Sequence, residues 1–106
     1  MSTTNLSDIP SKEVMPGFRG KFVHSENMTY VHWEIEKGAV LPLHHHMHEQ
    51  LTNLIEGEFE MTVGGETKVL KSGDVAVIPS NVEHEGVAKT ACQIIDVFSP
   101  RRDDLM

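Results

Sequence analysis

Hydrophobic and polar residues alternate along several short segments of the chain, which is the pattern of half-buried β-strands. In residues 28–36, Val31, Trp33 and Ile35 share one face, and more polar residues occupy the positions between them. Residues 59–63 alternate in the same way, and residues 93–98 form a last strand that Pro100 ends. No segment keeps the helical period over three turns, so the pattern predicts an all-β fold.

Turn signals separate these segments at intervals of about 8 to 12 residues, as in β-sandwiches and barrels. Gly57 marks a corner between two strands, and Gly64-Gly65 predicts a two-residue hairpin, because glycine adopts positive φ without a Cβ clash. The apolar run 75–78 lies between turn signals and predicts a fully buried strand. We expect one domain: an extended N-terminal arm (1–17), a β-barrel (18–102) and a C-terminal tail (103–106).

Composition narrows the classes of partner. The chain has 106 residues, enough for one core, and a formal net charge of −7, which disfavours nucleic acid and anionic membranes. It contains neither a membrane-length apolar run nor the basic and apolar N-terminal regions of a secretory signal, so the expected location is cytoplasmic. Cys92 is the single cysteine and forms no internal disulfide. An anionic substrate would need a local cation, either a metal or one of the arginines Arg19, Arg101 and Arg102.

Four of the seven histidines crowd into one segment, His44-His45-His46-Met47-His48. If that segment is a strand, His44, His46, His48 and Gln50 project to the same side, with His44 and His46 about 7 Å apart along it. Two such imidazoles can hold one ion. A solvated loop, or a tag-like segment that binds metal incidentally, would also explain the cluster. His45 is expected to be exposed, and His48 could be a ligand, a neighbour of a ligand or a substrate contact.

The spacing of these histidines resembles the first motif of the cupin superfamily. That motif places two histidines, a carboxylate and a glycine after an earlier glycine, here Gly38, His44, His46, Gln50 and Gly57. Most cupins have glutamate where this chain has Gln50.

A later stretch resembles the second cupin motif, here Gly73, Pro79, Asn81 and His84. Asn81 replaces the usual glycine, and asparagine tolerates positive φ better than other residues with a Cβ. Ala88 replaces the final asparagine of the motif. The resemblance implies a jelly-roll barrel of six to eight strands with one divalent ion (Ni, Zn, Mn or Fe) bound by His44, His46, Gln50 and His84.

Residues 16–20, 44–50 and 96–102 extend the resemblance, over nearly the whole chain, to the KdgF-type pectin-degradation cupins. The last of these segments discriminates most, because generic cupins lack it, and the amide at Gln50 is usual in that family. Such proteins hasten the opening of 4,5-unsaturated monouronates from pectin or alginate to linear keto-deoxyuronates. The resemblance implies a small anionic sugar as substrate, with Asp96 and Arg102 in catalysis. It further implies substrate contacts from Phe98, Arg102 and His48.

The residues themselves leave alternatives open. Cys92, Ile94, Asp96 and Phe98 share a face, and a carboxylate among apolar neighbours is a candidate acid/base or a structural group paired with Arg101. Neutral ligands would leave the ion near +2, which favours redox-neutral Lewis-acid chemistry. An iron-dependent dioxygenase and a non-catalytic sugar- or metal-binding module are the alternatives. Small cupins usually pair, so we expect a homodimer, to which the arm could contribute.

Overall fold

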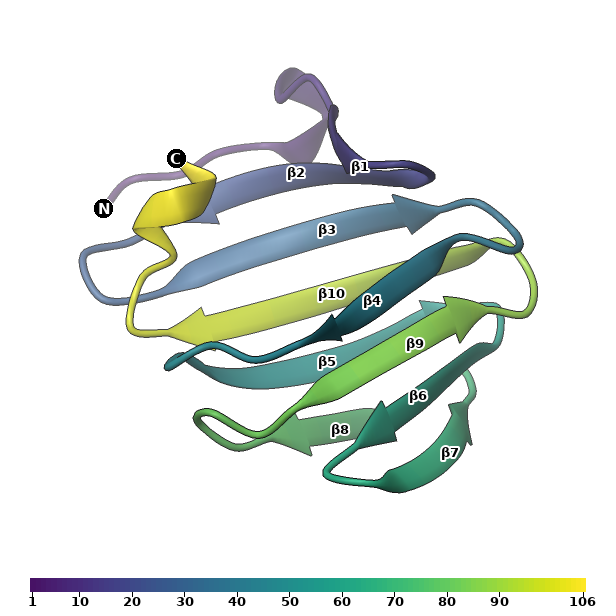
Figure 1. Ribbon diagram of the computed structural model, residues 1–106. Helices are drawn as coiled ribbons and strands as arrows, with labels where there is room; N and C mark the ends of the chain where they lie inside the picture. Colours follow the sequence, from purple (N-terminus) through teal and green to yellow (C-terminus); the bar gives the residue numbers. More distant parts are fainter.

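Two antiparallel sheets face each other in the computed structural model, which describes residues 1–106 (Figure 1). The six-stranded sheet has the order β1 (Lys12–Met15), β2 (Phe18–His24), β3 (Thr29–Ile35), β10 (Cys92–Ser99), β5 (Glu49–Glu56) and β8 (Val75–Ile78). The four-stranded sheet has the order β4 (Val40–His44), β9 (His84–Ala88), β6 (Phe59–Val63) and β7 (Glu66–Leu70). Two 3₁₀ turns, η1 (Leu6–Asp8) and η2 (Asp103–Leu105), lie near the termini. The all-β jelly roll is confirmed. It has ten strands rather than six to eight, because β1 and β7 each add an edge to a sheet.

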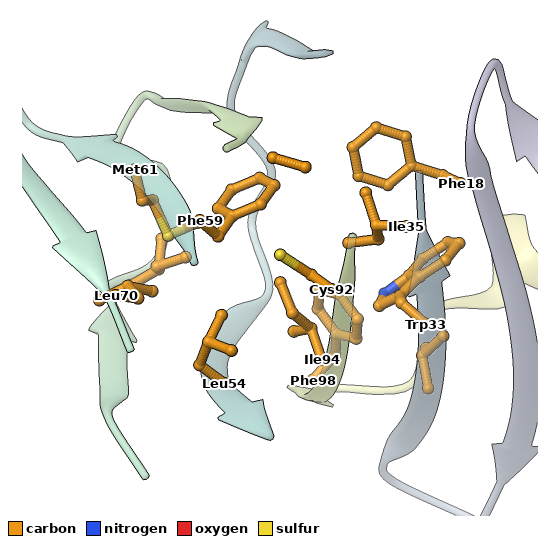
Figure 2. Packing of buried hydrophobic residues seen from close by; sticks show 13 residues of the cluster. Phe18, Trp33, Ile35, Leu54, Phe59, Met61, Leu70, Cys92, Ile94 and Phe98 are labelled. Carbon is orange, nitrogen blue, oxygen red and sulfur yellow. The ribbon is translucent and has the colours of Figure 1, made fainter. Parts of the chain in front are cut away.

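The hydrophobic core lies between the two sheets (Figure 2). Phe59 and Met61 of β6 face the side chains of β3 and β10, including Trp33 and Ile94. The predicted alternation is confirmed in both long strands, since every second residue of β3 and β10 is buried. Asp96 occupies one of these inward positions, opposite Val31 in the β3–β10 register. The period of two therefore carries a carboxyl group into the core.

The prediction of a fully buried strand at residues 75–78 is wrong. Val75 and Val77 are 55% and 59% exposed, whereas Ile78 is fully buried. The reason is that the second sheet covers only one face of the six-stranded sheet, so alternate residues of β8 point away from the core. Leu51 and Ile55 of the neighbouring β5 are also exposed. The outer face of β5 and β8 therefore carries four exposed apolar side chains, beside Glu49 and Asn53.

Turns form where glycine or asparagine permits them. Gly64 and Gly65 have φ of 56° and 84° and join β6 to β7, which confirms the predicted hairpin. Asn81, in the position of the second-motif glycine, is the one non-glycine residue with positive φ, at 64°. Its backbone N–H donates to the carbonyl of His46 at 2.8 Å. The turn at Asn81 thus ties the second motif to the histidine segment.

Substitution at Asn81 tests the role of its backbone conformation. Asn81→Ala should lower the free energy of unfolding by about 1 kcal/mol, because alanine pays the left-handed penalty without a compensating side-chain bond. Asn81→Gly should keep the wild-type stability within a few tenths of a kcal/mol. Urea unfolding of the two variants checks this, and an alanine variant as stable as the glycine variant would contradict it.

The expected N-terminal arm is joined to the barrel through β1. This strand pairs with β2, and Val14 and Met15 at its end line the central cavity. No helix in the structure combines the length and apolar character needed to cross a membrane.

Candidate functional site

One cavity of about 340 Å³ lies between the two sheets. Its volume falls near the lower end of the range of about 300–1000 Å³ that is typical of small-molecule sites. Most of its lining is apolar, from residues such as Phe18, Trp33 and Phe59. The polar and charged groups that line it are His44, His46, Gln50, Thr52, His84, Asp96 and Arg102. The structure therefore brings the four predicted metal ligands, Asp96, Phe98 and Arg102 to one cavity.

Three histidines converge from separate parts of the chain. His44 ends β4 and stands opposite His84, the first residue of β9, while His46 lies in the connection to β5. One potential ligand atom from each lies within 4.8 Å of the others. The ring centroids of His44 and His84 are 4.1 Å apart, and those of His46 and His84 are 5.0 Å apart. These side chains are arranged to hold a metal ion.

Each of the three rings is held by a backbone carbonyl two residues away. The Nδ1 atom of His44 lies 2.8 Å from the carbonyl oxygen of Pro42. The Nδ1 atom of His46 lies 2.9 Å from the carbonyl oxygen of His48, and that of His84 lies 2.9 Å from the carbonyl oxygen of Val82. A carbonyl only accepts, so Nδ1 must donate, and a neutral ring then presents a lone pair at Nε2. This anchoring of the second nitrogen is the usual arrangement around a metal-bound histidine.

The lowered pKa values of His84 and His46 favour the neutral ring that binds a metal ion. Burial lowers the pKa of His84 to about 4, and burial, followed by the nearby Arg102 charge, lowers the pKa of His46. His84 is therefore neutral at pH 7. Its Nε2 is buried without a hydrogen-bond partner. Because an unpaired buried acceptor is costly, the cluster fits a cation.

Gln50 adds an oxygen to the cluster. This buried residue of β5 donates from Nε2 to Thr52 Oγ1 at 2.9 Å, and its Oε1 lies 3.1 Å from His46 Nε2. The proton of the neutral His46 ring is on Nδ1, so His46 Nε2 and Gln50 Oε1 are both hydrogen-bond acceptors and face each other without a proton between them. A divalent ion beside them would satisfy both, so the donor set of three imidazoles and one amide oxygen fits a metal.

Asp96 lies next to this donor set, buried on β10. Its Oδ1 accepts from Thr52 Oγ1 at 2.7 Å and its Oδ2 accepts from Trp33 Nε1 at 2.9 Å. Burial raises the pKa of this carboxyl, and the hydrogen bonds from its neighbours oppose the rise. The alternative pairing of Asp96 with Arg101 does not occur, since Arg101 pairs with Asp103.

Of the three arginines, only Arg102 lines the cavity. Its side chain is largely buried, with the guanidinium 4.7 Å from the Phe98 ring centroid and its Nε and Nη2 bonded to Asp104. That pairing holds the pKa of Asp104 below its usual range. Arg19 instead pairs with Glu34 and Glu36 outside this cavity. The position of Arg102 distinguishes it as the candidate cation.

His48 and His45 are not part of the cluster. The connection 45–48 is not a strand, so the expectation that alternate residues of the whole segment share a face fails there. His45 is exposed, as expected. The ring of His48 packs at 5.5 Å from that of His46 and lines a separate depression beside Arg101.

Sequence reasoning missed Thr52 and Trp33, whose links to Asp96 span 44 and 63 residues and leave no local signal.

Comparisons with known proteins show the family of this chain. The cupin domain family matches residues 31–98. The pectin degradation protein KdgF of Dickeya dadantii (strain 3937) is 31% identical over 102 residues, which cover 93% of each chain. The chain belongs to the KdgF-type cupins.

Solved structures show the same relationship for this KdgF-type cupin. The structure of KdgF from Halomonas sp. is 33% identical, with a TM-score of 0.93, and the match covers 100% of this chain and 99% of that one. An RmlC-like cupin from Shewanella frigidimarina NCIMB 400 is 31% identical, with a TM-score of 0.93 and coverage of 97% and 94%. The fold is therefore shared with these two proteins over nearly the whole chain.

Proposed function

We propose that this cupin accelerates the ring opening of 4,5-unsaturated monouronates from pectin or alginate, giving linear keto-deoxyuronates. The observation that carries the proposal is that one cavity joins the histidine cluster, a buried carboxyl group and an arginine. Similarity to a pectin degradation protein over 93% of the chain supports this substrate class.

The reaction is an isomerisation that needs no oxidant, reductant or second substrate. The anomeric hydroxyl loses its proton and becomes a carbonyl as the bond from C1 to the ring oxygen breaks. The ring oxygen becomes the C5 ketone, and the electron pair of the C4–C5 double bond takes up a proton at C4. One proton leaves and one arrives, so a single acid/base group is enough for both transfers.

Asp96 fits the proton transfers, because its raised pKa brings its two protonation states closer in energy at neutral pH. Asp104 occupies the Nε–Nη2 edge of the Arg102 guanidinium, and the Nη1–Nη2 edge would bind the substrate carboxylate through two parallel hydrogen bonds. Phe98 would form the wall beneath it. His44, His46, Gln50 and His84 would hold a divalent ion, which supplies Lewis-acid polarisation of a substrate oxygen.

Lyase-generated uronate tests the proposal directly. Loss of the unsaturated ultraviolet chromophore should be faster with enzyme than without it at the same pH, and chelation should abolish the difference. Oxygen uptake should stay at background, whereas a dioxygenase would consume oxygen. Uronate binding without faster chromophore loss would indicate a binding module and contradict the proposal.

We also propose that the chain forms a homodimer through the apolar outer face of β5 and β8. Leu51 and Val77 are register partners with exposed side chains there, and exposed apolar patches mark interaction sites. Light scattering should give twice the 11.9 kDa chain mass, and Val77→Lys should shift the mass toward the monomer. A wild-type mass of one chain would rule out the dimer.

A further inference from the structure

Thr52 lies between Gln50 and Asp96 and hydrogen-bonds to both. It is on β5, two residues after Gln50, and stands opposite Asp96 in the register with β10. Its side chain is buried, with 2% of the residue exposed. Its Oγ1 is 2.9 Å from Gln50 Nε2 and 2.7 Å from Asp96 Oδ1. One hydroxyl therefore joins a candidate metal ligand to the candidate acid/base.

The directions of these bonds follow from the number of protons. A hydroxyl has one proton, and the amide nitrogen Nε2 of Gln50 can only donate to it. The Thr52 proton therefore goes to Asp96, and Oγ1 is left as an acceptor for the amide N–H of Gln50. The amide must then point its oxygen the other way, toward His46 Nε2 at 3.1 Å. With the amide reversed, an NH₂ group would face the histidines and repel a cation.

We propose that Thr52 is a positioning residue that fixes the amide oxygen of Gln50 toward the metal centre. The proposal rests on the ligand set of the proposed function, but on no step of the ring opening. Residues that hydrogen-bond to a metal ligand typically contribute about 10–100-fold to metal affinity. Thr52 acts on the fourth ligand in this way, as the backbone carbonyls act on the three histidines.

Zinc titration of the metal-stripped protein against a chromophoric chelator measures this contribution. Thr52→Val keeps the side-chain shape but removes the hydroxyl, and should lower zinc affinity by about 10–100-fold. Thr52→Ser and Thr52→Ala form a second pair that lose the same methyl group, of which only serine keeps the hydroxyl. Serine should bind zinc more tightly than alanine by a similar factor. The matched control is Thr62→Val, which removes an exposed hydroxyl paired with Thr67 and should leave the affinity unchanged.

Equal zinc affinity in the serine and alanine variants would overturn the proposal, and so would a folded valine variant that binds as tightly as the wild type. Thermal unfolding of the metal-stripped variants establishes that each is folded. The uronate assay is a separate readout. A wild type that binds zinc but does not hasten ring opening would refute the proposed function alone. Equal affinities in an active enzyme would refute the role of Thr52 alone.

Discussion

Asp96→Asn should slow the uronate ring opening by about 10²–10⁴-fold, the usual contribution of a positioned acid/base group. Asparagine has nearly the same size as aspartate but cannot take up a proton and return it. Asp96 hydrogen-bonds to Thr52 and Trp33 and does not belong to the group of candidate metal ligands. The variant should therefore still bind one metal ion per chain. Initial rates of chromophore loss, with elemental analysis of the same preparation, measure both effects.

The control for this variant is Asp74→Asn. Asp74 accepts from the backbone N–H of Lys71 in an exposed turn and does not line the cavity, so its replacement should leave the rate unchanged. If Asp96→Asn kept the full wild-type rate while Asp74→Asn behaved as expected, Asp96 would have no acid/base role. A rate lost together with the metal would instead show that Asp96 acts on the metal centre.

His84→Ala should lower metal affinity by more than about 100-fold, because removing a ligand costs more than removing a group that only orients one. The metal content after desalting should fall well below one ion per chain, and the catalysed ring opening should fall with it. The wild type should also gain stability from the ion, about 2.7 kcal/mol at a metal concentration of 100 times Kd. Unfolding with and without added metal should show no such gain in the variant.

His45→Ala provides the matched control, since His45 belongs to the same histidine-rich segment but is exposed and outside the cluster. It should keep the metal content, the metal-dependent stability and the activity of the wild type. Equal metal loss in both variants would indicate incidental binding by the segment as a whole. Full metal binding by His84→Ala would remove His84 from the ligand set.

The alternation of the long strands was enough to predict their buried faces. β3 and β10 each pair with a strand along both edges, and one face of each packs on the core, so the period of two maps directly onto inside and outside. The same reasoning placed Asp96 inside the barrel. The two cupin-like motifs were enough to predict that the three histidines converge, because two motifs in order and at the right separation form a specific signal.

Other features depended on contacts that a local pattern does not contain. The run Val75–Ile78 has the composition of a fully buried strand, but only one face of its sheet is covered, so Val75 and Val77 are exposed. The parity rule failed at His48, because the chain leaves the strand after His44 and starts the next at Glu49. The resemblance implies Arg102, but its place on the cavity wall depends on the turn of the C-terminal tail, in which Arg102 pairs with Asp104 and Arg101 with Asp103.

The carbonyl anchors of the histidine rings have a consequence for how the protein acquires its ion. Each Nδ1 is bound within its own stretch of backbone, so the rings are oriented before any ion arrives. Loading should then require little rearrangement, and ions should exchange by dialysis of the native protein without refolding. A preformed imidazole site ranks first-row metals by their intrinsic affinities, with copper and zinc above manganese. The ion found after purification will therefore reflect the metals supplied to the host cell as much as any preference of the barrel.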